Sequence, residues 1–187
     1  MARGEIGFVG LGIMGKPMVR NLMKADYSVT VYDIVAESVE ELATDGAIAA
    51  SSAAEVASNN PIVITMVPDS PQSEAAILGP GGVLEGASEG DTVIDMSSIA
   101  PASSQKIAAA CEEAGVNFLD APVSGGETGA IDGTLAVMVG GKKDIFDANF
   151  DIMSAMSGSI VLCGPYGAGN TTKLANQIIV AGNIAAL

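Results

Sequence analysis

Three glycines near the start of the chain have the spacing of a nucleotide-binding turn. Gly10, Gly12 and Gly15 directly follow residues 5–9, an apolar run typical of a short buried strand. The first glycine permits a tight turn, the second lets the backbone approach a pyrophosphate, and the third lets the next helix pack on the strand. Free N–H groups at the start of that helix favour phosphate. The predicted cofactor contacts of this turn are Gly10, Leu11, Gly12, Ile13, Met14 and Gly15.

An acidic residue follows the second predicted strand, residues 28–32, and lies 18 positions after Gly15. The carboxylate of Asp33 can accept hydrogen bonds from both ribose hydroxyls of NAD, whereas it would repel the 2′-phosphate of NADP. The alternative interpretation is a turn residue at a strand end. We favour cofactor binding by Asp33, and therefore NAD over NADP.

A lysine lies one turn into the last predicted helix, after the glycine-rich turn 164–170. Lys173 has Asn176 and Gln177 at i+3 and i+4 on the same helix face. The positive end of the helix dipole and partial burial both lower the pKa of a lysine, which makes acid–base chemistry possible. The alternative is a solvated surface lysine. A buried role is favoured by the apolar neighbours Leu174, Ala175, Ile178 and Ile179.

A second unusual segment is the run Asp120 to Gly129, in which a strand end is followed by Ser124, Gly125 and Gly126. Consecutive backbone N–H groups beside one hydroxyl form a suitable cradle for a carboxylate. An ordinary glycine turn is an equally good interpretation of this segment taken alone.

Missing residues exclude several chemistries. The chain has no histidine, so an imidazole base and a Ser-His-Asp hydrolase are both excluded. None of its three tyrosines is followed four positions later by a lysine, as short-chain reductases require. The P-loop sequence and a set of zinc ligands are also missing, so no metal site is expected. A nicotinamide enzyme of this sequence must use a carboxylate, a thiol or a lysine.

The composition indicates which binding partners and which cellular compartment to expect. The 22 acidic residues outnumber the 8 basic ones, and no basic stripe exists for nucleic acid or for an anionic membrane. No apolar run approaches the ~18 residues of a membrane span. The first strand begins by residue 5, which leaves no room for a signal peptide, and two separated cysteines suit a reducing compartment. We expect a cytoplasmic protein.

The elements that position these residues alternate between strand and helix from residue 5 to about residue 100. Such alternation predicts an α/β fold of the Rossmann type, a doubly wound, mainly parallel sheet with helices on both faces. The predicted strands are 5–9, 28–32, 61–67, 91–96, 117–120, 135–139 and 159–163. The predicted helices after the first are 36–44, 51–58, 70–78, 101–114, 142–156 and 170–187.

The last predicted helix ends within its own apolar pattern, without a glycine cap or a charged last turn. We therefore expect a nucleotide-binding domain at residues 1–165 and, at residues 166–187, the start of a truncated interdomain helix. Such a helix is expected to lead to a second domain.

Three motifs together carry a family resemblance. Residues 7–15, 120–126 and 167–176 resemble the corresponding motifs of the β-hydroxyacid dehydrogenase family. The resemblance implies that Lys173 is the general acid–base and that Asn176 positions the substrate or the lysine. Gln177 lies where some relatives have an asparagine. The implied carboxylate site is Ser124, Gly125 and Gly126, and the further implied cofactor contacts are Val67, Pro68, Gln72 and Ser98.

The resemblance also implies an all-helical C-terminal domain, which we expect to be absent from this sequence, together with a reaction and partners. The expected reaction is reversible hydride transfer between NAD and a small β-hydroxy acid. Among such reactions, the resemblance favours the reduction of tartronate semialdehyde to glycerate. Oxidation of 3-hydroxyisobutyrate, reduction of another semialdehyde or of an imine, and NAD binding without catalysis are the alternatives. The implied partners are a small carboxylate substrate and, in the complete protein, further copies of the same chain in a homo-oligomer.

Overall fold

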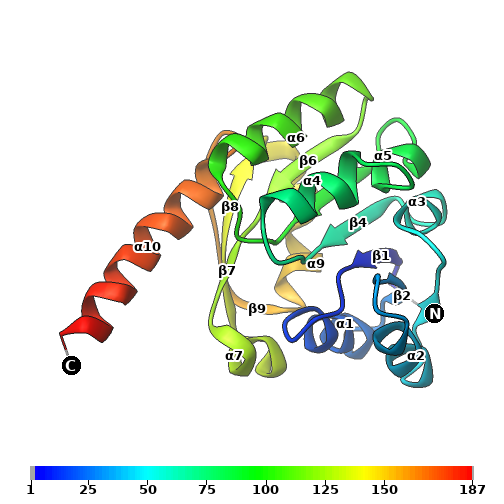
Figure 1. Cartoon of the computed structure of the whole chain (residues 1–187), viewed down its shortest axis with the longest axis horizontal. Coiled ribbons are helices and arrows are strands. Elements are labelled where there is room, and N and C mark those ends of the chain that lie inside the picture. Colours follow the sequence, from blue (N-terminus) through cyan, green and yellow to red (C-terminus); the bar gives the residue numbers. More distant parts are fainter. Residues whose placement is uncertain (1–2, 187) are drawn as a thin grey trace.

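The computed structural model describes residues 3–186, which form one sheet flanked by helices (Figure 1). The strands of this part of the chain are β1 (Glu5–Val9), β2 (Ser28–Tyr32), β3 (Ile48–Ala49), β4 (Ile62–Thr65), β5 (Thr92–Asp95), β6 (Asn117–Asp120), β7 (Val123–Ser124), β8 (Leu135–Gly141) and β9 (Ser157–Gly164). The helices are α1 (Gly15–Lys24), α2 (Ala36–Thr44), α3 (Ala53–Ser58), α4 (Ser70–Leu78), α5 (Val83–Gly86), α6 (Pro101–Glu113), α7 (Gly126–Asp132), α8 (Lys143–Ala148), α9 (Phe150–Ser154) and α10 (Ala168–Ala185).

The sheet has the order β3-β2-β1-β4-β5-β6-β8-β7, and β9 pairs with β8. The strands from β1 to β6 are all parallel, whereas β8 runs antiparallel to β6 and β7. Strand order reverses between β1 and β4, which is where a doubly wound sheet opens a ligand crevice at the carboxyl ends of its strands. The predicted α/β fold of the Rossmann type is confirmed.

The central strands are buried on both faces, and their side chains alternate between two cores. Ile6 and Phe8 of β1 belong to the core beneath α1, α2 and α9, while Val9 belongs to the core beneath α3 to α6. Figure 1 shows α1 and α2 on one side of the sheet and α4 and α6 on the other. In β4, β5 and β6 the side chains alternate in the same way. The core beneath α1, α2 and α9 contains Ile64, Ile94 and Leu119, and the core beneath α3 to α6 contains Val63, Val93 and Phe118.

Helix α10 packs on β8, β9 and α6 at its start, and its later part extends away from the sheet (Figure 1). Its apolar side chains Leu174, Ile178, Ile179 and Ile184 are exposed, with Ile178 at 73%. Lys173 itself is buried, as predicted, but the apolar neighbours named in support of that prediction face solvent and do not cover it. Leu187, the last residue of the predicted helix, lies outside the described residues.

Most predicted elements lie within two residues of their predicted positions, and the differences have local causes. The predicted helix 142–156 is divided into α8 and α9 at Asn149, whose side-chain amide donates to the carbonyl oxygen of Ile145 at 2.8 Å and competes with helical hydrogen bonding. The predicted elements do not include β3, α5, β7 and α7. Each is short, and β7 has two residues defined by their pairing with β8. Within residues 3–186, no helix combines the length and the apolar character needed to cross a bilayer.

Candidate active site

A pocket of about 890 Å³ opens at the carboxyl ends of β1, β2 and β4, at the strand-order reversal. This volume lies within the range of about 300–1,000 Å³ that is usual for ligand and cofactor sites. The structure brings all of the predicted cofactor contacts to this one pocket: Gly10, Leu11, Gly12, Ile13, Met14, Gly15, Asp33, Val67, Pro68, Gln72 and Ser98.

Each of the three glycines in the turn lacks a side chain for a different structural reason. Gly10 has a φ of 100°, and a Cβ there would lie 2.2 Å from the carbonyl oxygen of Met66. A Cβ on Gly15 would lie 2.0 Å from the carbonyl oxygen of Gly10, so the start of α1 needs glycine for close packing. A Cβ on Gly12 would meet no described atom within 4 Å. Since the fold itself leaves room there, the open space beside Gly12 suits the close approach of a pyrophosphate.

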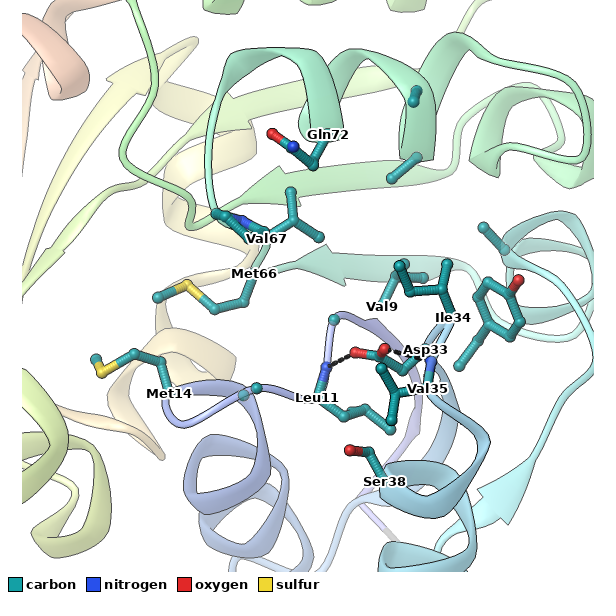
Figure 2. Close-up of a pocket in the computed structure, with 18 of the residues that line it drawn as sticks. Val9, Leu11, Met14, Asp33, Ile34, Val35, Ser38, Met66, Val67 and Gln72 are labelled. Carbon is teal, nitrogen blue, oxygen red and sulfur yellow. Dashed lines mark hydrogen bonds between the residues drawn. The ribbon is translucent and has the colours of Figure 1, made fainter.

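Asp33 lies on the loop between β2 and α2, beside the glycine turn (Figure 2). Its Oδ2 accepts a hydrogen bond from the backbone N–H of Leu11 at 2.5 Å, and its Oδ1 accepts one from the N–H of Val35 at 2.8 Å. The two bonds orient the carboxylate, and each oxygen retains capacity to accept another donor. The next residue, Ile34, is 90% exposed, and no lysine or arginine is among the described residues that line the pocket.

The opposite wall of the pocket is the loop between β4 and α4, which carries Val67 (Figure 2). Pro68 follows on the same loop and also lines the pocket. The backbone N–H of Val67 donates to Ser97 Oγ at 2.9 Å, and the N–H of Ser97 donates to Asp95 Oδ1 at 3.0 Å. The same oxygen accepts from the hydroxyl of Thr65 at 2.9 Å. Burial raises the pKa of Asp95 above its usual range, and hydrogen bonds from its neighbours oppose that rise. This buried network holds the pocket wall in place.

Lys173 is 9% exposed and projects from the second turn of α10. None of the ion pairs among residues 3–186 involves it. Burial lowers the pKa of its amino group below the ordinary lysine value, the direction expected for an acid–base group that works nearer neutral pH.

The serine turn and the lysine helix meet in space. Ser124 ends β7 and is half-buried, and Gly125 and Gly126 follow with φ values of 139° and 62° at the start of α7. The side-chain amide of Asn176 in α10 donates to Ser124 Oγ at 3.5 Å. Gln177 is exposed, and its Oε1 accepts from the amide of Asn176 at 3.2 Å. The structure thus brings two of the predicted motifs together, with Gln177 at the edge.

Two buried polar residues that support this arrangement were not predicted. Asp120 accepts hydrogen bonds from the first turn of α10, and Asn170 joins that turn to the loop after β5, next to Ser98 of the pocket. Both fall inside the predicted motifs, but their hydrogen-bond partners lie far away along the chain. Among residues 3–186, no group of three or more His, Cys, Asp or Glu side chains has a metal-binding arrangement.

The sequence and the fold match known proteins. Residues 5–164 match the family model described as the NAD binding domain of 6-phosphogluconate dehydrogenase. The chain is 43% identical over 183 residues to the 2-hydroxy-3-oxopropionate reductase of Escherichia coli (strain K12). The aligned residues make up 98% of this chain and 62% of that protein. It is 40% identical over 180 residues to the mitochondrial 3-hydroxyisobutyrate dehydrogenase of Homo sapiens, covering 96% of this chain and 54% of the relative.

A solved structure of the 3-hydroxyisobutyrate dehydrogenase of Mycobacterium tuberculosis with L-serine matches the fold with a TM-score of 0.89 at 34% identity. The match covers 97% of this chain and 61% of that one. The chain therefore spans between 54% and 62% of the length of these three relatives.

Proposed function

Because the chain belongs to the β-hydroxyacid dehydrogenase family, we propose that it acts in reversible hydride transfer between NAD and a small β-hydroxy acid. The observation that carries the proposal is the contact of Asn176 with Ser124, which joins the helix of the buried Lys173 to a turn suited to a carboxylate. Reduction of tartronate semialdehyde to glycerate is the proposed reaction, supported by the 43% identity to a 2-hydroxy-3-oxopropionate reductase. Oxidation of 3-hydroxyisobutyrate is the second candidate, supported by the 40% identity to its dehydrogenase.

The pocket residues fit a dinucleotide, since the space beside Gly12 is open and the carboxylate of Asp33 is held at the end of β2. When bound, the nicotinamide supplies or accepts the hydride. We propose NAD as the cofactor because Asp33 would repel a 2′-phosphate and no basic side chain among the described lining residues would neutralise one. Val67, Pro68, Gln72 and Ser98 form the proposed opposite wall of the binding site.

In the proposed mechanism, the hydroxyl of Ser124 and the backbone N–H groups of Gly125 and Gly126 hold the substrate carboxylate. Lys173 donates a proton to the aldehyde oxygen during reduction and takes it back from the hydroxyl during oxidation. Its lowered pKa suits both directions because the neutral and charged forms are closer in free energy. Asn176 orients the substrate or the lysine through its contact with Ser124. Holding the reactants in place contributes more to the rate than the proton transfer, which typically supplies about 10²–10⁴-fold.

The test combines binding and turnover. NADH binding is measured by calorimetry, and NADH oxidation is followed with tartronate semialdehyde, methylmalonate semialdehyde, succinic semialdehyde and a cyclic imine. Lys173→Ala is expected to lower kcat by at least about 100-fold with NADH affinity unchanged. Lys143→Ala, which changes an exposed lysine paired with Asp147, is the matched control and keeps both properties.

Normal turnover by Lys173→Ala would refute the role of the lysine. NADH binding without oxidation by any substrate would show an NAD-binding module instead of an enzyme. Faster turnover of methylmalonate semialdehyde than of tartronate semialdehyde would reverse the order of the two candidate substrates.

A further inference from the structure

The carboxylate of Asp120 is buried at the end of β6 and faces the first turn of α10. Its Oδ1 accepts the backbone N–H of Gly167 at 2.7 Å, and its Oδ2 accepts the N–H of Asn170 at 3.0 Å. The first N–H groups of a helix have no acceptor within the helix and carry its positive dipole end. One aspartate therefore binds the start of α10 with both oxygens.

Glycines make room for this contact. A Cβ on Gly169 would lie 2.4 Å from the carbonyl oxygen of Met138 and 2.9 Å from Asp120 Oδ2. A Cβ on Gly140 would lie 2.4 Å from Asp120 Oδ1. Since side chains at these two positions would displace the carboxylate or the helix, the close approach of α10 to β6 and β8 is built into the backbone.

Asn170 provides a second attachment for the same helical turn. Its Oδ1 accepts the backbone N–H of Ile99 at 3.0 Å, and its amide nitrogen donates to Ser104 Oγ at 3.0 Å. Lys173 lies three residues after Asn170, on the same face of α10, and both side chains are buried. The lysine is thus one turn beyond two fixed points.

We propose that Asp120 is a positioning residue, which fixes the first turn of α10 and thereby places Lys173 in the site. The inference rests on the proposed acid–base role of Lys173. No ion pair among residues 3–186 joins Asp120 to Lys173, so Asp120 acts through the helix and not through a direct charge contact. Burial raises the pKa of Asp120, while the N–H donors of α10 oppose that rise.

The test is Asp120→Asn, which keeps the size of the side chain. It replaces one carboxylate oxygen by an NH₂ group, which would face a backbone N–H of α10 and cannot accept its hydrogen bond. Asp91→Asn is the matched control, because Asp91 also accepts a backbone N–H, that of Ser88 at 2.7 Å, on a loop before β5. Acetylation of each lysine by acetic anhydride is measured by mass spectrometry, with Lys143, whose side chain is 74% exposed, as the internal standard.

In Asp120→Asn, acetylation of Lys173 relative to Lys143 is expected to rise about tenfold, since a charged hydrogen-bond acceptor of the first turn is lost. With a semialdehyde that the wild-type protein reduces, the kcat of Asp120→Asn is expected to fall about 10- to 100-fold. The Kd for NADH is expected to stay within about twofold of the wild-type value, because the pocket residues keep their own supports. Asp91→Asn is expected to leave all three quantities unchanged.

Wild-type acetylation of Lys173 in a folded Asp120→Asn variant would overturn the inference, as would an equal loss of NADH affinity and kcat. Should the wild-type protein turn over no substrate, the proposed function fails, yet the acetylation result still decides whether Asp120 places Lys173. Hydrogen exchange on the wild-type protein gives a test that needs no variant. The amide hydrogens of Gly167 and Asn170 are expected to be protected, and fast exchange of both would overturn the inference.

Discussion

Gly12 and Gly15 belong to the same turn, but we expect alanine to affect a different property of the protein at each position. A Cβ on Gly15 would lie 2.0 Å from the carbonyl oxygen of Gly10 and 3.3 Å from the ring of Phe8. Such crowding forces the start of α1 away from β1. A Cβ on Gly12 would touch no described atom within 4 Å and would occupy the pocket. Gly15→Ala should therefore damage the fold, and Gly12→Ala should damage binding.

The expected magnitudes follow from these contacts. Overpacking a close contact costs about 1–3 kcal/mol, so we expect Gly15→Ala to lower the free energy of unfolding by about 2 kcal/mol. For a domain of this size, that loss corresponds to a fall in Tm of about 4–8 °C. We expect Gly12→Ala to change the free energy of unfolding by less than about 0.5 kcal/mol. Its Kd for NADH should rise at least about tenfold, equivalent to about 1.4 kcal/mol.

Urea unfolding measures the stability of both variants, and calorimetry with NADH measures their affinity under the same conditions. Each variant is the control for the other, because both add one methyl group to the same turn. Equal destabilisation by Gly12→Ala and Gly15→Ala would contradict these different roles of the two glycines. Wild-type NADH affinity in Gly12→Ala would equally refute them.

Two further predictions concern carboxylates at strand ends. Asp33→Ser should weaken NADH binding about tenfold and lower the preference for NADH over NADPH, because the variant lacks both the ribose acceptor and the repulsion of a 2′-phosphate; an unchanged ratio of the two Kd values by calorimetry would contradict this. Burial raises the pKa of Asp95 in the folded protein, so the folded state holds this proton more tightly than the unfolded chain does. The contribution of Asp95 to the free energy of unfolding therefore falls as pH rises from about 3.9 through the raised pKa. In urea unfolding at several pH values, Asp95→Asn should lack this fall and give a more positive slope of unfolding free energy against pH than the wild type. The same slope in variant and wild type would show that Asp95 makes no such contribution.

Local sequence patterns were sufficient to predict the bounds of several elements. The strands β1 and β2 and the helices α2 and α4 have the predicted bounds because their apolar pattern and their end signals agree. Strand β7 and helix α7 could not be predicted in this way, since Val123 and Ser124 become a strand through their pairing with β8. The break at Asn149 depends on a side-chain hydrogen bond that helical periodicity does not reveal.

The candidate site shows the same division. The predicted residues lie in the pocket, at the turn between β7 and α7, or along α10. The sequence could single them out because each motif is a short continuous segment. The supports are contacts between distant segments. Asp120 meets Gly167 across 47 positions of sequence and Asn170 across 50, and no local pattern indicates such a pair. Two acidic residues that each end an apolar strand, at positions 95 and 120, were the available signal.

The register of β5 and β6 connects both halves of the proposed site. Asp95 and Asp120 are direct partners in this parallel pair, and both are fully buried. Asp95 supports the pocket wall through Ser97, whereas Asp120 supports the start of the lysine helix. Efficient transfer requires the reacting groups to be held within about 3–3.5 Å of each other, a tolerance that flexible loops alone do not meet. Because adjacent strand ends carry both supports, movement of the cofactor wall relative to Lys173 would require a shift in the most buried part of the sheet.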